Sequence, residues 1–247
     1  YIDTELNRPM ARLPFKADPK EFLADNHYIA SKRLLNVCNK YYKQEAVRDE
    51  INHAFEKLRK RGHMIYYEDL SVNQREKVTK AETGYTIPWD VVWKESSLST
   101  PARPVFDASS KTSTGYSLND ILATGVPDLA KLLDIVLEWQ IGPKAFVGDV
   151  SQFYCTIGLE EDSWPFQKLL LRKDLNPDGD LIRAVITCCI FGVCSSGGIS
   201  EVHLRRFSDS IRNNFPEVAK LLCKNRYVDD ILKSCSTTKA AKELIEN

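Results

Sequence analysis

The sequence has no long hydrophobic run and no excess of charge of either sign. Its longest apolar stretch, from Ala184 to Cys194, is far shorter than the ~20 residues that a membrane-spanning helix needs, so no membrane partner is expected. The 34 basic and 34 acidic residues give a formal net charge of +0. Many nucleic-acid enzymes are basic overall, so this balance is mild evidence against that class, although a local basic surface can still bind phosphate.

The sequence also lacks the cysteine spacing of a structural zinc site, because none of its seven cysteines forms a Cys-x-x-Cys pair. Cys188, Cys189 and Cys194 lie in an apolar run, where buried free thiols are the simplest interpretation. Free thiols are typical of a reducing compartment rather than of secreted proteins. No signal peptide is visible and the first residue is Tyr1, which predicts a segment of a longer polyprotein.

Length and hydrophobic content are sufficient for a sizeable core, since 43% of the 247 residues are hydrophobic. Val47, Ile51, Phe55 and Leu58 recur at helical spacing, and Gly62 follows them as a stop signal. Short apolar runs bounded by turn residues predict strands between such helices. The ranges expected to be helical are 22–42, 47–61, 128–141, 199–212 and 240–246, and 68–83 is expected to be a surface loop.

The sequence also indicates where one helix starts and ends and where two strands form a hairpin. Asp128 is the expected N-cap of a helix that ends at Gly142. The strands 167–172 and 181–191 are joined by turn residues at 176–180, which predicts a hairpin. The apolar face expected for the helix after Asp128 consists of Leu129, Leu132, Leu133, Val136 and Leu137.

Two adjacent acids occur in the run Tyr227-Val228-Asp229-Asp230. Apolar residues flank them, which predicts a β-hairpin with the carboxylates at its tip. Because like charges repel, a strand pair has no folding reason to hold them together. A divalent cation would remove this repulsion, since carboxylate oxygens are suitable ligands for Mg²⁺. The alternative is an exposed turn without a function.

A second apolar run, Ala145-Phe146-Val147-Gly148-Asp149-Val150, predicts a strand that carries one acid. If this strand lies beside the hairpin, Asp149 joins Asp229 and Asp230 in a three-carboxylate cluster. Such a cluster can hold two metal ions that activate a 3′ hydroxyl and stabilise the pyrophosphate that leaves during phosphoryl transfer.

The two acidic segments resemble motifs A and C of reverse transcriptases. The runs Arg103–Lys111 (RPVFDASSK) and Ser117–Leu122 (SLNDIL) are similar to segments of the Pao/BEL family of LTR retrotransposons, and the resemblance extends over 13–233. It implies an α/β (α+β) right-hand polymerase with fingers and an antiparallel palm sheet. Only 17 residues follow Asp230 (247 − 230), so the thumb is expected to be absent from this chain. The implied fingers are 1–124 and 157–195, and the implied palm is 125–156 and 196–247.

The resemblance implies an RNA-directed DNA polymerase that adds dNTPs to a primer on an RNA or DNA template. Asp149, Asp229 and Asp230 would be the catalytic ligands of Mg²⁺ or Mn²⁺, and the carbonyl of Val150 would assist. The implied location is cytoplasmic, including virus-like particles. The thumb, RNase H, protease and integrase are expected in the rest of the polyprotein, outside this chain.

The resemblance also implies a nucleotide pocket. Arg103 matches the arginine that grips the triphosphate, a task that suits the guanidinium fork, and its alternative is a surface ion pair. Tyr154 matches the aromatic residue beneath the sugar, where a ring excludes a 2′ hydroxyl; its alternative is an ordinary core residue. Phe191 and Gly192 occupy the place of motif B, against the nascent base pair.

The chain departs from the family pattern where relatives carry Ser-Pro or Ala-Pro at the end of motif B. It has Gly197 and Gly198 instead, which are expected to loosen the entry to the helix starting near Ile199. Two other functions therefore stay open. One is a decayed or co-opted copy that binds nucleic acid without catalysis, and the other is a structural segment of the polyprotein.

Overall fold

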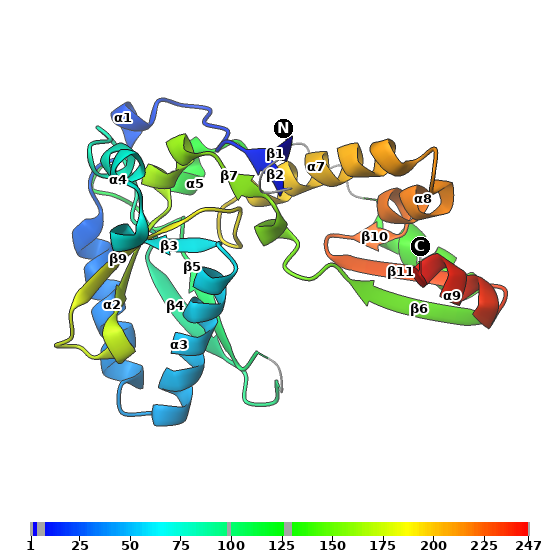
Figure 1. The fold of residues 1–247 in the computed structure, drawn as a ribbon, viewed down its shortest axis with the longest axis horizontal. Helices are drawn as coiled ribbons and strands as arrows, with labels where there is room; N and C mark the ends of the chain where they lie inside the picture. Colours follow the sequence, from blue (N-terminus) through cyan, green and yellow to red (C-terminus); the bar gives the residue numbers. More distant parts are fainter. Residues whose placement is uncertain (1, 4–7, 98–99, 126–129, 247) are drawn as a thin grey trace. The chain divides into compact units, whose positions relative to one another are not determined.

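The computed structural model describes residues 2–3, 8–97, 100–125 and 130–246. The fold is mixed α/β, with helices beside small sheets of two or three strands. The chain divides into two compact units (Figure 1): the first is 1–123 with 154–196, and the second is 124–153 with 197–247. The identification of these units with fingers and palm stays a prediction. Within the described ranges, no helix is long and apolar enough to cross a membrane.

One antiparallel sheet of the first unit has the order β3 (Met64–Tyr66), β9 (Leu181–Ile186), β8 (Lys168–Arg172). Strands β8 and β9 form the hairpin that the turn residues at 176–180 predict. Strand β9 ends at Ile186, earlier than expected. The reason is that the backbone just beyond it pairs elsewhere, since the Leu159 N–H donates to the carbonyl of Thr187 (2.7 Å).

The first unit contains the helices α1 (Pro19–Phe22), α2 (His27–Tyr41) and α3 (Glu45–Lys60). Helix α3 buries Ile51 and Phe55, as its periodicity predicts, and the Phe55 ring meets that of Trp89 edge-on at 4.6 Å. The single helix expected over 22–42 is wrong at its start. Buried Asn26 exchanges two side-chain hydrogen bonds with the backbone of Thr86 (2.8 and 2.9 Å), and this contact separates α1 from α2.

The surface loop expected over 68–83 is also wrong, because this range contains the helix α4 (Val72–Thr79). Ser71 caps α4: its hydroxyl accepts from the Gln74 N–H (3.3 Å), and the Gln74 side chain accepts from the Ser71 N–H (3.1 Å). This capping box is visible in the sequence as Ser-x-x-Gln. The polar composition of the helix concealed it, since only Val78 is buried.

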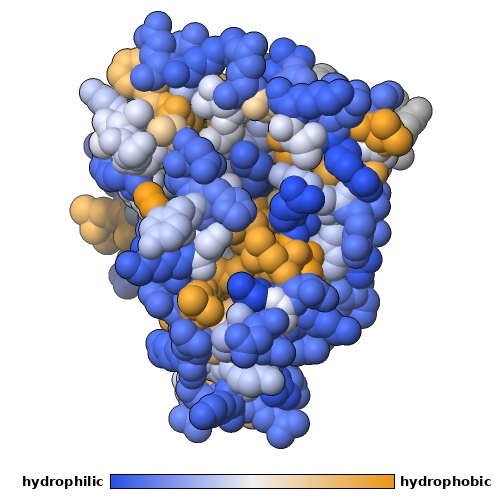
Figure 2. Space-filling model, turned by 90° about the vertical axis from the view of Figure 1, so that its left-hand side faces the viewer, coloured by the Kyte–Doolittle hydropathy of each residue, from blue (hydrophilic) through white to orange (hydrophobic). Residues whose placement is uncertain are grey.

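The surface and the core of the first unit differ in composition. Hydrophilic residues cover most of the face seen in Figure 2, with hydrophobic residues gathered near its middle. Most large apolar side chains are internal, and Trp89, Tyr85 and Ile87 are among those that are fully buried. The remaining elements of the first unit are short: β1 (Ile2–Asp3), β2 (Arg8–Ala11), η1 (Tyr67–Asp69), β4 (Trp89–Trp93), β5 (Ala102–Phe106), α5 (Leu118–Ile121), η2 (Tyr154–Thr156), β7 (Gly158–Leu159), η3 (Glu161–Phe166) and η4 (Lys173–Leu175).

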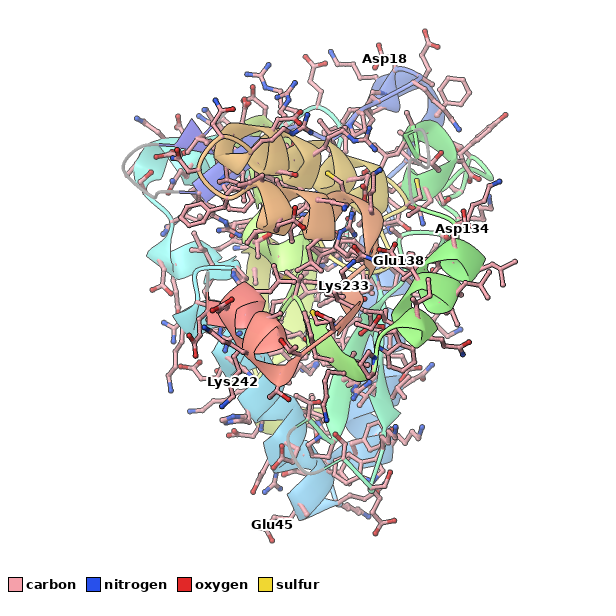
Figure 3. All side chains as sticks on the ribbon, turned by 90° about the vertical axis from the view of Figure 1, so that its right-hand side faces the viewer. Asp18, Glu45, Asp134, Glu138, Lys233 and Lys242 are labelled. Carbon is pink, nitrogen blue, oxygen red and sulfur yellow. The ribbon has the colours of Figure 1, made fainter. Side chains whose placement is uncertain are left out.

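The second unit is built on an antiparallel sheet with the order β10 (Arg226–Tyr227), β11 (Asp230–Cys235), β6 (Lys144–Asp149). Two helices pack on its two sides, α6 (Leu132–Ile141) on one and α9 (Thr238–Glu246) on the other (Figure 3). Glu138 of α6 accepts a hydrogen bond from the Lys233 ammonium of β11 (2.7 Å). This contact ties the helix to the strand that follows the acidic pair.

Two further helices complete the second unit, α7 (Ser196–Ile211) and α8 (Pro216–Lys224). Helix α7 begins before the expected Ile199, so both glycines lie in its first turn. A Cβ atom on Gly198 would lie 2.4 Å from the carbonyl oxygen of Thr124. Gly198 is therefore needed for a close backbone approach, rather than as a loose entry to the helix.

The leucines expected on the apolar face of the helix after Asp128 are on a helix, but those that the structure describes are not buried. Asp128 and Leu129 lie outside the described residues. Helix α6 begins at Leu132, and Ile135 is its buried residue. Three of the leucines expected to be buried are exposed: Leu132, Leu133 and Leu137, at 46%, 67% and 55%.

Candidate active site

The acidic pair lies at a tight turn, as the flanking apolar residues predict. Tyr227 of β10 pairs with Asp230 of β11, so the loop between them consists of Val228 and Asp229 alone. Val228 has a φ of 56°, a left-handed backbone conformation that β-branched residues rarely adopt. Such conformations persist where the surrounding structure holds them, and they are often found at functional sites.

The residue that holds this turn is Arg226, which is 2% exposed. Its guanidinium donates to both carboxylate oxygens of Glu201 in α7 (2.8 and 2.7 Å) and to the carbonyl of Leu222 (3.1 Å). A further hydrogen bond reaches the carbonyl of Val228 itself. The guanidinium also lies 5.3 Å from the ring centre of Phe153. Arg226 is therefore buried and fully hydrogen-bonded, and it holds Val228 in its left-handed conformation.

Asp149 and Asp230 lie directly opposite each other, because β6 and β11 pair in that register. Residues opposed in an antiparallel pair share a face, so these two carboxylates lie on the same side of the sheet. The Val150 N–H donates to the carbonyl of Asp229 (2.8 Å), which joins the end of β6 to the turn. The three aspartates and Val150 therefore meet at one end of one sheet.

No cationic side chain neutralises this end of the sheet: among the ion pairs of the described residues, none involves Asp149, Asp229 or Asp230. Asp149 and Asp230 are exposed and Asp229 is half-buried. The oxygens of the three carboxylates do not all lie within 4.8 Å of one another. Unpaired, accessible carboxylates that repel each other match the ligands that Mg²⁺ and Mn²⁺ take.

The first unit brings together three of the residues expected to contact the nucleotide. The rings of Tyr154 in η2 and Phe191 meet edge-on, 4.4 Å apart, and Phe191 is 59% exposed. Gly192 has a φ of 95°, and a Cβ there would lie 2.0 Å from the carbonyl oxygen of Phe106. No other residue fits at Gly192 without displacing strand β5.

Arg103 lies on β5 with its side chain exposed, and its Nε donates to the Thr100 carbonyl (3.4 Å). Throughout the described ranges it forms no ion pair, so the alternative of a surface ion pair does not describe it. Its guanidinium keeps donors available for a ligand.

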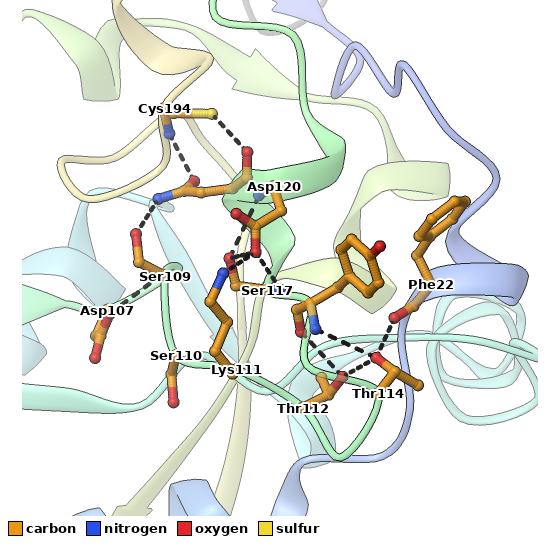
Figure 4. A network of polar contacts seen from close by, with 12 residues as sticks. Phe22, Asp107, Ser109, Ser110, Lys111, Thr112, Thr114, Ser117, Asp120 and Cys194 are labelled. Carbon is orange, nitrogen blue, oxygen red and sulfur yellow. Dashed lines mark hydrogen bonds and ion pairs between the residues drawn. The ribbon is translucent and has the colours of Figure 1, made fainter.

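The Ser117–Leu122 run has a role that its resemblance did not explain. The amide of Asn119 donates to the Ser109 hydroxyl and to the Gly192 carbonyl (both 2.8 Å), and its oxygen accepts from the Cys194 N–H (2.8 Å). Ser109 and Cys194 are labelled in Figure 4. Asn119 therefore joins the loop after β5 to the loop that carries Phe191 and Gly192.

Neighbouring Asp120 fixes the start of α5. It accepts from the N–H and hydroxyl of Ser117 (both 2.7 Å) and pairs with Lys111 (Figure 4). The hydrogen bond from Lys111, followed by those from Ser117, lowers the pKa of Asp120 to about 2. The carboxylate is therefore ionised at neutral pH and holds the helix start in place.

The expected site residues thus form two sets. Asp149, Val150, Asp229 and Asp230 belong to the second unit, and Arg103, Tyr154, Phe191 and Gly192 belong to the first. Sequence reasoning missed Arg226, Glu201 and Asn119. Arg226 follows Lys224 and Asn225 in the sequence, so no local pattern marks it as buried or identifies Glu201 as its partner.

Comparison with known proteins does not identify a family for this chain. No family model matches the chain, and no curated protein matches it. A function therefore has to be argued from the residues themselves.

Proposed function

We propose that this chain is the polymerase core of a Pao/BEL-type reverse transcriptase, which transfers nucleotides from dNTPs to a primer 3′ hydroxyl. The observation that carries the proposal is the register that sets Asp149 opposite Asp230, beside the turn residue Asp229. Two segments that are far apart in the sequence supply these acids. A structural turn would not require an acid on a separate strand to face the pair.

The three aspartates would hold the divalent cations, which supply the charge that activates the primer hydroxyl and stabilises the leaving pyrophosphate. The chain's own contribution is to place these acids. Arg226 and Glu201 hold the Val228–Asp229 turn, and the Val150 N–H anchors it to β6. This placement leaves the side chains of Asp149 and Asp230 free to bind.

The first unit supplies residues suited to the nucleotide. The exposed guanidinium of Arg103 would bind the triphosphate, because it offers several donors to phosphate oxygens. The paired rings of Tyr154 and Phe191 offer an aromatic surface for the sugar and base. Asn119 and Gly192 keep the Phe191 loop in place.

The part of strand β6 beside Asp149 is suited to contact with the end of a primer. On β6, the residues that share the face of Asp149, namely Ala145 and Val147, are also exposed, whereas Phe146 and Gly148 on the other face are half-buried. A primer–template is the partner proposed for the exposed acids at the end of this strand. The thumb and the other enzymes of the polyprotein would act from outside this chain.

A copy that binds nucleic acid without catalysis is the second candidate function. The observation that favours it is the spacing of the three carboxylates, whose oxygens do not all come within 4.8 Å. In this function the chain would bind a primer–template but would not extend it.

Primer extension separates the two functions. We expect a polyprotein segment that includes this chain and the sequence following it to extend a primer on RNA with dNTPs and Mg²⁺ or Mn²⁺. The Asp229→Asn variant should lose extension and keep primer–template binding, since it keeps the shape and removes the charge. Binding without extension by the wild type would favour the second candidate, and normal extension by Asp229→Asn would refute the assignment of Asp229.

A further inference from the structure

A second group of potential metal ligands lies in the first unit and shares no residue with the three aspartates. His63 precedes β3, Cys155 lies in η2, and Cys188 follows β9. Their ligand atoms all lie within 4.8 Å of one another. We propose that His63, Cys155 and Cys188 form a binding site for a soft divalent cation, with Zn²⁺ as the expected ion.

The backbone around the three residues is tightly connected. The carbonyl of His63 accepts from the Thr187 N–H (3.0 Å) and from the Cys188 thiol (3.7 Å). Arg8 donates to the carbonyl of Cys155 (2.6 Å), which fixes η2. Ligands on fixed backbone segments lose little freedom when a metal binds, so this connection favours binding.

An unpaired atom of His63 gives further support. The Nδ1 atom of His63 is buried, and no hydrogen-bond partner for it occurs within the part of the chain that the structure describes. A buried polar atom without a partner is costly, and native structures rarely leave one without a reason. A metal ion bound at Nδ1 would give this atom its partner.

The chemistry of the three side chains selects the ion. Two sulfur atoms and one imidazole nitrogen are ligands that Zn²⁺ prefers, with Zn–S near 2.3 Å and Zn–N near 2.0–2.1 Å. Tetrahedral geometry at those lengths places ligand atoms about 3.5–3.8 Å apart, and the three ligand atoms here all lie within 4.8 Å of one another. Because Cys155 is half-buried, water can reach the cluster and would supply a fourth ligand.

The proposed site would also fix the aromatic pair. Cys155 follows Tyr154 directly, and Cys188 lies three positions before Phe191. A cation bound by both cysteines would therefore link the two segments that bring these rings together. The site does not depend on the polymerase function, because none of its ligands belongs to the carboxylate set.

Cobalt is the probe for the test, since thiolate ligands give Co²⁺ a near-ultraviolet charge-transfer band that carboxylates do not give. The reduced, chelator-treated 247-residue chain is titrated with Co²⁺ and then with Zn²⁺. We expect one equivalent of Co²⁺ to produce the band and Zn²⁺ to abolish it. We also expect Zn²⁺ to raise the melting temperature, because a ligand that binds the folded state stabilises it.

Variants identify the ligands. Cys155→Ser, at a half-buried position, should fold and lose the band, and His63→Asn should weaken it. Cys189→Ser is the matched control, since Cys189 is a buried neighbour outside the cluster. Asp149→Asn should also keep the band, which separates this site from the carboxylates.

Three results would overturn the proposal. One is the absence of a band in the wild-type protein. Another is a band that persists in Cys155→Ser. The third is a Cys155–Cys188 disulfide in protein prepared without reductant, together with no band after reduction, which would assign the pair to redox chemistry instead.

Discussion

Arg226 and Glu201 form a buried ion pair in which the Nη2 atom of the arginine lies 2.7 Å from Oε2 of the glutamate. Their side chains are 2% and 14% exposed. The same guanidinium donates to the carbonyl of Val228, so the pair acts on the turn that carries Asp229.

Glu201→Gln should therefore destabilise the protein by about 3–5 kcal/mol, because it leaves the Arg226 charge buried without its partner. Denaturant unfolding measures the change. Glu138→Gln is the control: it removes the partner of Lys233 in a more exposed pair, whose side chains are 20% and 43% exposed. That change should cost about 1 kcal/mol or less. Equal effects of the two variants would contradict a special role for Arg226.

Asp149→Asn should stabilise the fold without a divalent cation and should make it less stable than the wild type when the cation is present. Without the cation, it removes a like charge directly opposite Asp230 and should stabilise the fold by up to about 1 kcal/mol. With Mn²⁺, the wild type should gain melting temperature and the variant should gain little. Asp134→Asn on α6 serves as the control. An equal gain for the wild type and Asp149→Asn would exclude Asp149 as a ligand.

Tyr154→Val should raise ribonucleotide incorporation relative to deoxynucleotide incorporation in the active polyprotein segment. The expected reason is that the ring excludes a 2′ hydroxyl, and discrimination of this kind comes from a clash with the wrong substrate. Phe191→Leu, which removes the ring that meets Tyr154, is the companion variant. An unchanged ratio in Tyr154→Val would make this tyrosine an ordinary packing residue.

Gly192→Ala should destabilise the first unit by about 2–4 kcal/mol, because it adds left-handed strain and a clash with the backbone of Phe106. Gly148→Ala is the matched control, since its Cβ would meet Ile231 at 3.8 Å, an ordinary contact. Thermal or denaturant unfolding compares the two. A small effect at Gly192 would mean that the loop next to β5 can move away.

Acid should weaken the start of α5 through Asp120. Its pKa in the folded protein is about 2, lowered from 3.8, so its ionised form adds stability that is complete above pH 4. This contribution is lost as the pH falls from about 4 to 2. Asp120→Asn should remove that part of the pH dependence of unfolding. Lys111→Met should reduce it as well, because Lys111 is the largest cause of the shift.

Local patterns predicted the elements that place the acids. Apolar residues on both sides of Asp229 and Asp230 were enough to predict the hairpin, and the run before Asp149 was enough to predict β6. Helix α3 was predicted because its apolar residues recur at a regular spacing. These elements depend on neighbours in the sequence, which is the information that a pattern contains.

The failures depend on distant partners. Asn26 interrupts the expected helix through Thr86, and Gly198 is fixed by Thr124. Spacing rules for zinc sites use nearby cysteines, so they could not find a cluster that joins His63 to Cys155 and Cys188. The exposed leucines of α6 show the same limit, because periodicity indicates an apolar side but not whether anything covers it.

The turn between β10 and β11 contains only two residues, and this has a consequence for insertions and deletions. Side chains alternate between the faces of a strand, so a shift of one position would set Ile231 opposite Asp149 and turn Asp230 to the other face. A single-residue indel in the turn would then remove a carboxylate from the cluster while leaving every acid in the sequence. The proposed site therefore depends on the length of this loop as well as on its aspartate.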